Sequence, residues 1–156
     1  MNPKIVELRH KLHSIAELSN KEYQTSNLIC QFFNLLGPDE TIPIAKTGKA
    51  FVFNGSGKGP SLMFRAELDA LPVAETLQAP YASQQLGIAH ACGHDGHMSI
   101  LAGLAEKISV QRPKKGRVIL LFQPAEELEQ GARNVINDAA FSKIEPDYLF
   151  ALHNIP

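Results

Sequence analysis

The sequence predicts an α/β domain over residues 1–156, built on a sheet whose central strands run parallel. Two observations carry this prediction. From residue 61 onward, short apolar runs alternate with amphipathic stretches, which is the order of strands and helices in α/β folds. One run, residues 117–122 (RVILLF), is apolar almost throughout, as strands buried on both faces are. With 44% apolar and 20% charged residues, a chain of 156 residues has the composition and length of one folded domain.

Two helices are predicted in the N-terminal third. The first begins at Asn2, a capping residue, with Pro3 at the first helical position. Its apolar residues then recur every three or four positions along one face. The second helix has its apolar residues between positions 28 and 36 and ends at a Gly-Pro pair. Ser19 and Glu22, three residues apart, resemble the capping box that opens a helix.

The middle of the chain predicts strands separated by glycine-rich turns. The turn over residues 54–60 (NGSGKGP) is a weak candidate for a phosphate-binding loop. It lacks the Lys-Ser ending and a helix behind it, so a hairpin-type turn is the better interpretation. The three strands cover residues 41–45, 50–53 and 61–64. The elements that follow are a helix, a strand, a helix and a strand over residues 95–108, 117–122, 128–139 and 148–152.

Composition excludes several classes of partner. The formal net charge is −1, so no electrostatic field favours nucleic acid or an acidic membrane surface. No apolar run approaches the length of a membrane helix, and charges stand where a signal peptide would be apolar. The two cysteines do not form a disulfide framework, and Cys30 fits a helix core. We therefore expect a reduced, cytoplasmic compartment and no nucleic-acid or membrane partner.

Polar side chains follow the predicted strands at the points where they end. Asp69 comes shortly after the strand at 61–64, the pair Glu126 and Glu127 after that at 117–122, and His153 after the last strand. Sites in open α/β sheets form beyond the carboxyl ends of the strands. A fourth group, residues 90–97 (HACGHDGH), opens a predicted helix. The sequence therefore predicts that three strands deliver polar groups to the same edge of the sheet.

Cys92 and His94 are candidate metal ligands. Residues two apart in an extended loop can point the same way, and zinc accepts thiolate and imidazole. Adjacent Glu126 and Glu127 diverge, so one could bind metal while the other faces a metal-bound water, as metal-assisted amide hydrolysis requires. The alternatives are a buried free cysteine beside a surface histidine, and a solvated acidic helix start. Asp69 would orient a ligand or else cap a local turn.

The other histidines have weaker interpretations. His90 and His97 could each touch substrate, or could support the ligands and the helix start. His10 and His13 lie among charged residues on the first predicted helix, and we expect both to be solvated.

Four segments in order resemble one family. They are residues 65–72 (RAELDALP), 91–97 (ACGHDGH), 122–127 (FQPAEE, followed by Gly131 and Ala132) and 153–156 (HNIP). Together they resemble the amidohydrolase branch of the aminoacylase and glutamate-carboxypeptidase metallopeptidases, which includes hippurate hydrolases, indole-acetyl-amino-acid hydrolases and N-acetyl-diaminopimelate deacetylases. Residues 12–19 with Glu22 also resemble that family's opening, with Ala16 where proline is usual.

The resemblance implies a three-layer α/β/α catalytic domain with a mixed, largely parallel central sheet. It implies two divalent metal ions, zinc or manganese foremost, with cobalt or nickel as alternatives. Cys92, His94, Glu127 and His153 fall on ligand positions, Glu126 on the general acid/base, and Asp69 on the catalytic aspartate that orients a ligand. The reaction implied is hydrolysis of the amide bond of N-acyl amino acids by a metal-bound water that the glutamate activates.

Two departures from the family pattern bear on function. Glu67 stands where aspartate is usual, one methylene longer. Members of the family are also much longer, so we expect residues 1–156 to be the N-terminal portion of the catalytic domain, truncated before the lid and dimerisation domain and a final histidine ligand. Apolar sheet surface should then lie open.

Three hypotheses follow. The first is an active metal-dependent amidohydrolase. The second is an inactive remnant that binds metal, a missing C-terminal half or a second copy as a homo-oligomer, without turnover. The third, a thiol hydrolase using Cys92 with His94, is disfavoured because such a nucleophile needs an oriented base and an oxyanion site, for which one short loop leaves little room.

Overall fold

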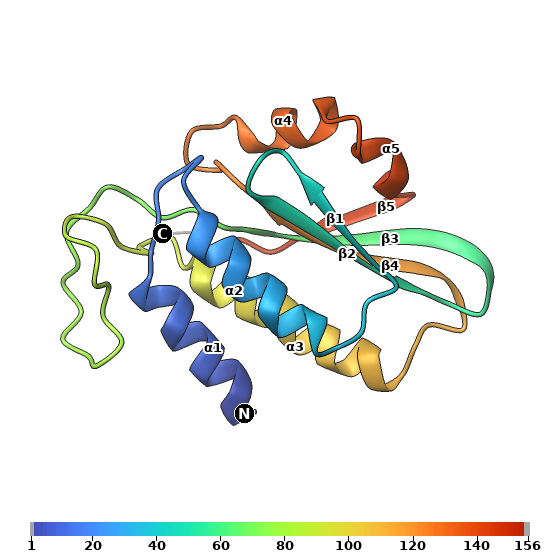
Figure 1. Ribbon diagram of the computed structural model, residues 1–156, viewed down its shortest axis with the longest axis horizontal. Coiled ribbons are helices and arrows are strands. Elements are labelled where there is room, and N and C mark those ends of the chain that lie inside the picture. The colour runs from blue at the N-terminus through green and yellow to red at the C-terminus, as the bar shows by residue number, and fades with distance from the viewer. Residues whose placement is uncertain (1, 155–156) are drawn as a thin grey trace.

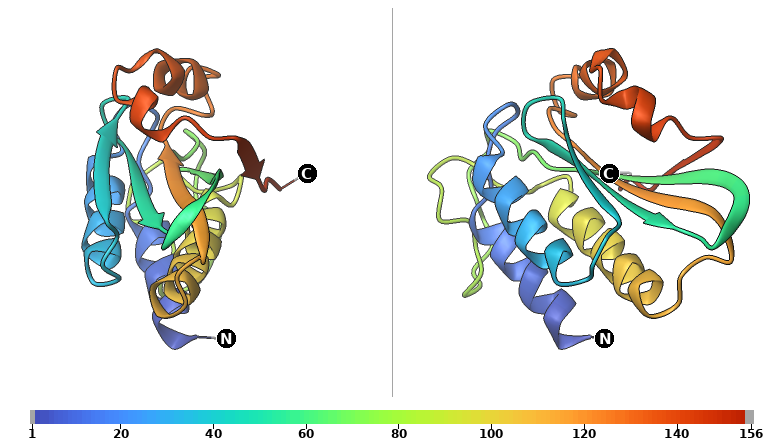
Figure 2. Two further views of the ribbon diagram at one scale, coloured as in Figure 1. Left: turned by 90° about the vertical axis from the view of Figure 1, so that its right-hand side faces the viewer. Right: turned by 45° about the vertical axis from the view of Figure 1, so that its right-hand side comes forward.

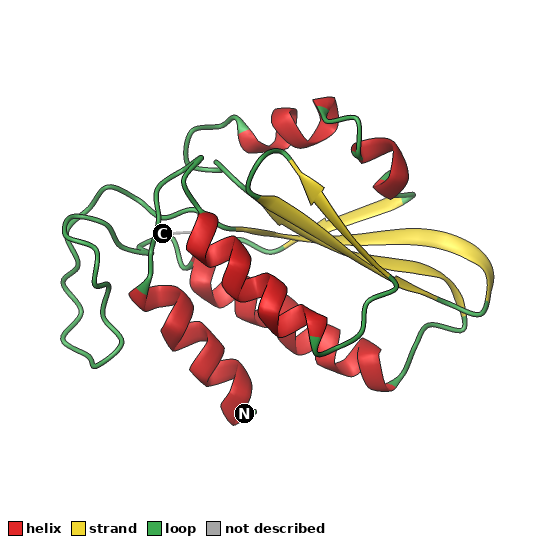
Figure 3. Ribbon diagram, in the orientation of Figure 1, coloured by secondary structure: helices red, strands yellow, loops and turns green. Residues whose placement is uncertain are grey.

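The computed structural model describes residues 2–154 and has one five-stranded sheet in the order β1-β2-β4-β3-β5 (Figure 1). The last two residues of the HNIP motif, Ile155 and Pro156, lie outside the described residues. The strands are β1 (Glu40–Ile44), β2 (Gly48–Asn54), β3 (Gly57–Glu67), β4 (Lys115–Gln123) and β5 (Tyr148–Ala151). The helices are α1 (Pro3–Ser14), α2 (Tyr23–Asn34), α3 (His94–Val110), α4 (Gly131–Asn137) and α5 (Phe141–Ile144) (Figure 3).

The sheet is mixed. β1 pairs with β2 and β2 with β4 in antiparallel fashion, whereas β3 runs parallel to both β4 and β5. The predicted α/β class is therefore confirmed, and the parallel pairs are the three strands that precede the polar segments. Their register places Glu67 opposite Gln123 and Arg65 opposite Ala151, so the carboxyl ends of these strands meet at one edge.

Helices cover both faces of the sheet, which gives three layers (Figure 2). α1, α2 and α3 bury one apolar cluster, in which the ring of Phe33 stacks on Phe51 at 4.2 Å and lies edge-on to Phe122. α4 and α5 cover the second cluster on the opposite face, where Val135 and Ile144 meet the sheet. The nearly all-apolar sequence of β4 reflects burial on both faces, because successive residues such as Leu120 and Leu121 enter opposite clusters.

α4 begins at Gly131 and not at position 128, so the predicted helix start is wrong. A tight turn precedes it, with positive φ at Ala125 (51°) and Glu129 (54°). The amide of Gly131 donates to the Ala125 carbonyl at 3.0 Å. A Cβ at Gly131 would lie 1.8 Å from the Pro124 oxygen, so only glycine fits. The turn, and not a helix, therefore carries the glutamate pair.

The glycine-rich segment after β2 does not join paired strands. β2 and β3 lie on opposite sides of β4, so the interpretation as a hairpin-type turn is wrong. The segment instead passes the start of β4, where the Gly55 amide donates to the Gly116 carbonyl at 2.7 Å. A Cβ at Gly55 would lie 2.7 Å from the Pro113 oxygen. Close backbone approach therefore explains the glycine at position 55.

β5 forms one edge of the sheet, and its side chains are uncovered. Tyr148, Leu149 and Phe150 of β5, and Leu152 just after it, are each at least half exposed, as the expected open apolar surface requires. Within residues 2–154, no helix combines the length and apolar character needed to cross a membrane.

Candidate metal centre

The polar segments meet beyond the carboxyl ends of β3, β4 and β5, beside the first turn of α3. Asp69 lies two residues after β3, Glu126 and Glu127 lie in the turn after β4, and His153 lies two residues after β5. His94 is the first residue of α3. The structure therefore brings all the predicted strand-end residues to one edge of the sheet.

Asp69 contacts both the segment that carries His94 and the turn that carries the two glutamates. It is fully buried, and its carboxylate accepts the amides of Glu126 at 3.1 Å and Glu127 at 3.0 Å and the hydroxyl of Ser19 at 2.7 Å. Its backbone carbonyl accepts the Nδ1 hydrogen of His94 at 2.8 Å. Asp69 therefore serves distant segments, and one residue sets the position of both an imidazole and a pair of carboxylates.

Two histidines face each other with their lone pairs. The Nδ1 atoms of His94 and His153 lie 2.8 and 2.7 Å from the carbonyls of Asp69 and Asn154. A carbonyl only accepts, so each Nδ1 carries the hydrogen and each neutral ring has its lone pair on Nε2. The two Nε2 atoms are 3.3 Å apart. Two acceptors at this distance require a cation or a proton between them.

Three groups of donor atoms within the described residues include His94. In each group, one ligand atom per residue lies within 4.8 Å of the others: Cys92, His94 and Glu127 in the first, His94, Glu126 and His153 in the second, and Glu67, His94 and His97 in the third. Sulfur, nitrogen and oxygen donors together suit a first-row divalent cation. The buried Oε1 of Glu127 has no hydrogen-bond partner among residues 2–154, as a ligand atom would not. The first two groups therefore fit a pair of divalent cations, and the single lone pair of His94 can bind only one of the two.

The two glutamates differ in access. The side chain of Glu126 is 29% exposed and that of Glu127 is 16% exposed. Oε2 of Glu126 lies 3.7 Å from Nε2 of His94 and 3.9 Å from Nε2 of His153. Glu126 is thus the carboxylate that is more open to an incoming molecule.

Cys92 holds its proton in the metal-free protein. Burial, the hydrogen bond with Glu127 and the charges of nearby carboxylates raise the pKa of the Cys92 thiol to about 12. A thiol nucleophile needs the opposite, a lowered pKa. This environment argues against the thiol hydrolase and means that a cation must displace the proton to gain a thiolate ligand.

Residues 63–156 match the model of peptidase family M20/M25/M40. The chain belongs to this family. It is 41% identical to an IAA-amino acid hydrolase of Arabidopsis thaliana over 94% of this chain and 31% of that protein. It is 39% identical to an N-acetyldiaminopimelate deacetylase of Oceanobacillus iheyensis over 96% of this chain and 40% of that protein.

A solved structure supports the same assignment. The YxeP protein of Bacillus subtilis, described as a dinuclear metal-binding peptidase of the M20 family, superposes with a TM-score of 0.90 at 36% identity. The match covers 98% of this chain and 43% of that one. This M20 chain therefore falls in the amidohydrolase branch and spans about two fifths or less of the length of these relatives.

Ser19 and Glu22 of this M20 chain do not form the predicted capping box. Glu22 is the N-cap of α2, but its side chain makes no cap hydrogen bond. It is fully buried and accepts the Ala125 amide at 2.9 Å and the Thr47 hydroxyl at 2.7 Å. Ser19 instead donates to Asp69. Both residues support the turn that carries the glutamate pair, a role that only distant partners reveal.

The expectation that His10 and His13 are solvated is wrong. His13 lies between two carboxylates, with Nε2 2.8 Å from Glu75 and Nδ1 3.1 Å from Asp95. His10 stacks on Tyr81 with ring centroids 3.8 Å apart. These contacts fasten the loop between β3 and α3 to α1.

His90 is buried, and neither of its ring nitrogens has a hydrogen-bond partner among residues 2–154. Burial lowers its pKa to about 4, although the charge of Asp95 acts in the opposite direction. His90 is therefore a neutral imidazole near one candidate ligand, with its ring centroid 6.5 Å from that of His94.

Proposed function

We propose that this M20 protein hydrolyses the amide bond of N-acyl amino acids with two divalent cations. Cys92, His94, Glu127 and His153 would hold the cations, and Glu126 would be the general acid/base. The observation that carries the proposal is the pair of facing imidazole lone pairs 3.3 Å apart, with a thiol and two carboxylates around them.

The similar proteins support the substrate class. One is an IAA-amino acid hydrolase and another is an N-acetyldiaminopimelate deacetylase. Both names describe removal of an acyl group from an amino acid, which is cleavage of an amide.

The residues of this chain would divide the chemistry as follows. When bound, the cations supply Lewis acidity at the amide carbonyl and increase the acidity of water. Glu126, the more exposed carboxylate, removes a proton as water adds to the carbonyl carbon. The carbon–nitrogen bond then breaks, and Glu126 returns the proton to the leaving amine. Asp69 holds the amides of Glu126 and Glu127, which keeps the base and the ligand carboxylate apart.

The test is release of free amino acid from N-acetyl and N-benzoyl amino acids after loading with zinc or manganese. We expect release that a chelator abolishes and that Glu126→Gln lowers by at least two orders of magnitude, in line with the contribution of a general base. Glu129→Gln, an exposed carboxamide in the same turn, is the matched control and should retain activity. No release with any of the four candidate metals would refute the proposal.

One observation favours a second candidate function. The uncovered apolar side chains of β5 are suited to contact with a partner chain or a second copy. Uptake of metal with no amino-acid release, together with a mass above that of the monomer in light scattering, would favour a metal-binding or partner-binding role without turnover.

A further inference from the structure

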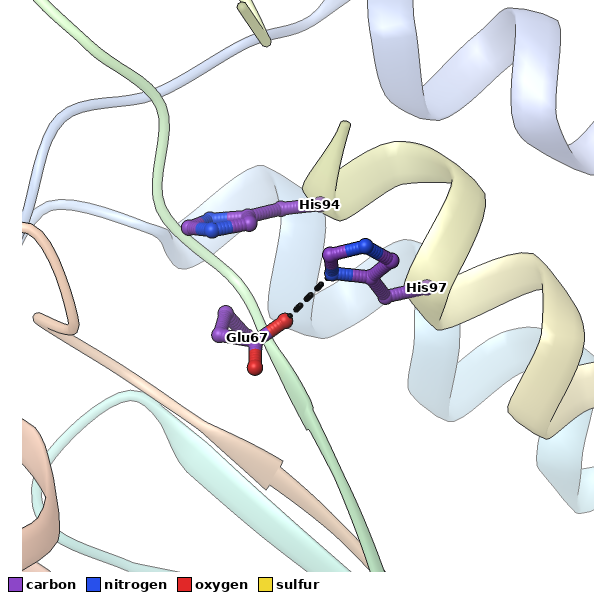
Figure 4. Close-up of side chains that lie close together, drawn as sticks. All are labelled: Glu67, His94 and His97. Carbon is purple, nitrogen blue, oxygen red and sulfur yellow. Dashed lines mark hydrogen bonds and ion pairs between the residues drawn. The ribbon is translucent and has the colours of Figure 1, made fainter. Parts of the chain in front are cut away.

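A chain of polar side chains links β4, β3 and α3 beside the candidate ligands. At the end of β4, Gln123 accepts from Nε of Arg65 at 3.0 Å. Nη1 of Arg65 lies 2.7 Å from Oε1 of Glu67, at the end of β3. Oε2 of Glu67 then lies 2.7 Å from Nδ1 of His97 on α3 (Figure 4). Glu67 is fully buried, and Gln123 and His97 are nearly so.

Packing alone does not explain this chain of contacts. α3 already buries apolar side chains against the sheet, among them Met98, Leu101 and Ala105. Buried ion pairs can often be replaced by apolar residues of similar volume without loss of stability, because desolvation offsets their attraction. Arg65 and Glu67 therefore indicate that the positions of the neighbouring elements must be fixed, and not that the ion pair is needed for stability.

His97 lies against both facing imidazoles. Its ring centroid is 5.6 Å from that of His94 and 5.2 Å from that of His153. The side chain of His153 is 38% exposed, and its own Nδ1 bonds only to the carbonyl of the next residue. The buried ring of His97 is therefore the fixed surface beside the more exposed of the two candidate ligands.

Glu67 fixes the orientation of that surface. A carboxylate bound to one ring nitrogen holds an imidazole in one orientation, which is how supporting carboxylates set metal-site histidines. Figure 4 shows Glu67 reaching from the end of β3 to His97, one turn along α3 from His94. Rotation of the His97 ring would break this 2.7 Å contact inside the core.

We propose that Glu67 and His97 form a positioning pair that sets the separation of His94 and His153 and thereby the affinity of the cation that those two share. The inference rests on the proposed function only in taking His94 and His153 as metal ligands. Glu67, His94 and His97 also offer ligand atoms within 4.8 Å of one another, so the test must separate positioning by His97 from direct ligation.

The test measures metal affinity and not hydrolysis. Metal-free protein is titrated with Co(II) in competition with a chelator, while the visible cobalt bands and the thiolate-to-cobalt band are recorded. His97→Phe keeps a ring of similar size but removes the Nδ1 donor. We expect it to weaken one of two cobalt sites by about 10- to 100-fold, the range for lost supporting contacts, and to shift the visible bands. The site that gives the thiolate band should change by less than twofold.

Two controls make the result specific. His10→Phe changes a histidine that stacks on Tyr81, away from the ligands, and should leave both cobalt affinities within twofold of the wild type. If His97→Phe does not fold, Glu67→Gln is measured in its place. It keeps the shape of the side chain but loses the charge, and it should weaken the same cobalt site.

Three outcomes would overturn the positioning pair. They are unchanged affinity at both cobalt sites, complete loss of one cobalt, which would make His97 or Glu67 a ligand, and a wild type that binds no cobalt. Failure of the protein to hydrolyse N-acyl amino acids would refute the proposed function and leave the cobalt result standing.

Discussion

Replacing Asp69 by asparagine should destabilise the metal-free protein by about 4 kcal/mol. Oδ2 of Asp69 accepts from Ser19 and Glu127, and Oδ1 accepts from Glu126. The carboxamide of Asp69→Asn can keep its oxygen at the position of Oδ2. Its NH₂ group then takes the position of Oδ1 and faces the Glu126 amide. One hydrogen bond to a charged group is lost, worth about 1.5–3 kcal/mol, and a buried donor is left unpaired at about 1–3 kcal/mol.

Urea unfolding of the metal-free protein measures this loss directly. The midpoint should fall at an unchanged slope, because the exposed surface of the unfolded chain is the same. Asp147→Asn is the matched control. That side chain is exposed and accepts one amide hydrogen bond, from Ser61 at 2.7 Å, so its loss should stay below about 1 kcal/mol. A loss below about 1 kcal/mol for Asp69→Asn as well would refute the argument that Asp69 holds the glutamate turn.

Three further predictions concern protonation and backbone geometry. Because the pKa of Cys92 is raised to about 12, zinc must displace the thiol proton when it binds. Near neutral pH, the zinc affinity of the wild type should therefore rise with pH more steeply than that of Cys92→Ala, by about an additional factor of ten per pH unit. Calorimetry in buffers of different ionisation enthalpy measures this difference. Because burial lowers the pKa of His90 to about 4, the unfolded state binds a proton that the folded state does not. The metal-free wild type should therefore lose about 3 kcal/mol of stability as pH falls from about 6.5 to 4, and His90→Leu should not show this loss in acid unfolding. Gly131→Ala should lower the melting temperature steeply, because its Cβ would meet the Pro124 oxygen at 1.8 Å, whereas Gly103→Ala, with no atom within 4 Å of the added Cβ, should stabilise α3 by about 1 kcal/mol in the same thermal unfolding experiment.

Sequence patterns could locate this site because its placement depends on local signals. The apolar run of β4 has no polar face, which is typical of a strand covered on both sides. Like β4, strands β3 and β5 are followed by polar segments. Once those strands are parallel, their carboxyl ends must meet, and the strand-end residues Asp69, Glu126 and His153 come together without any knowledge of side-chain contacts.

The supporting residues could not be predicted in the same way, because their partners are remote in sequence. Ser19 and Glu22 match a capping box locally, yet Ser19 bonds to a residue 50 positions away and Glu22 to one 103 positions away. His13 has the sequence surroundings of a surface residue, and only the fold brings Glu75 and Asp95 to it. Local propensity cannot distinguish such contacts from solvation.

The predicted start of α4 is wrong for a different reason. The apolar spacing after the glutamate pair is helical, but Ala125 and Glu129 adopt positive φ, a conformation that their side chains do not favour. This turn costs conformational energy, but it keeps the two adjacent carboxylates beside Asp69 and out of a helix. Backbone strain of this kind concentrates at functional sites, so a failed local prediction at residues 125–130 agrees with the location of the site.

The contacts of Asp69 also determine how metal should act on stability. Its carbonyl orients His94 and its carboxylate orients Glu126 and Glu127, and none of these hydrogen bonds involves a metal. We therefore expect the fold to hold the candidate ligands in place before metal binds, in contrast to small zinc domains that fold only when the metal binds. Metal should then stabilise this protein by mass action alone, by about 1.4 kcal/mol for each tenfold increase in free metal above the dissociation constant. A metal-free protein that is unfolded at 25 °C would contradict this reasoning, because it would show that the cations, and not Asp69, assemble the centre.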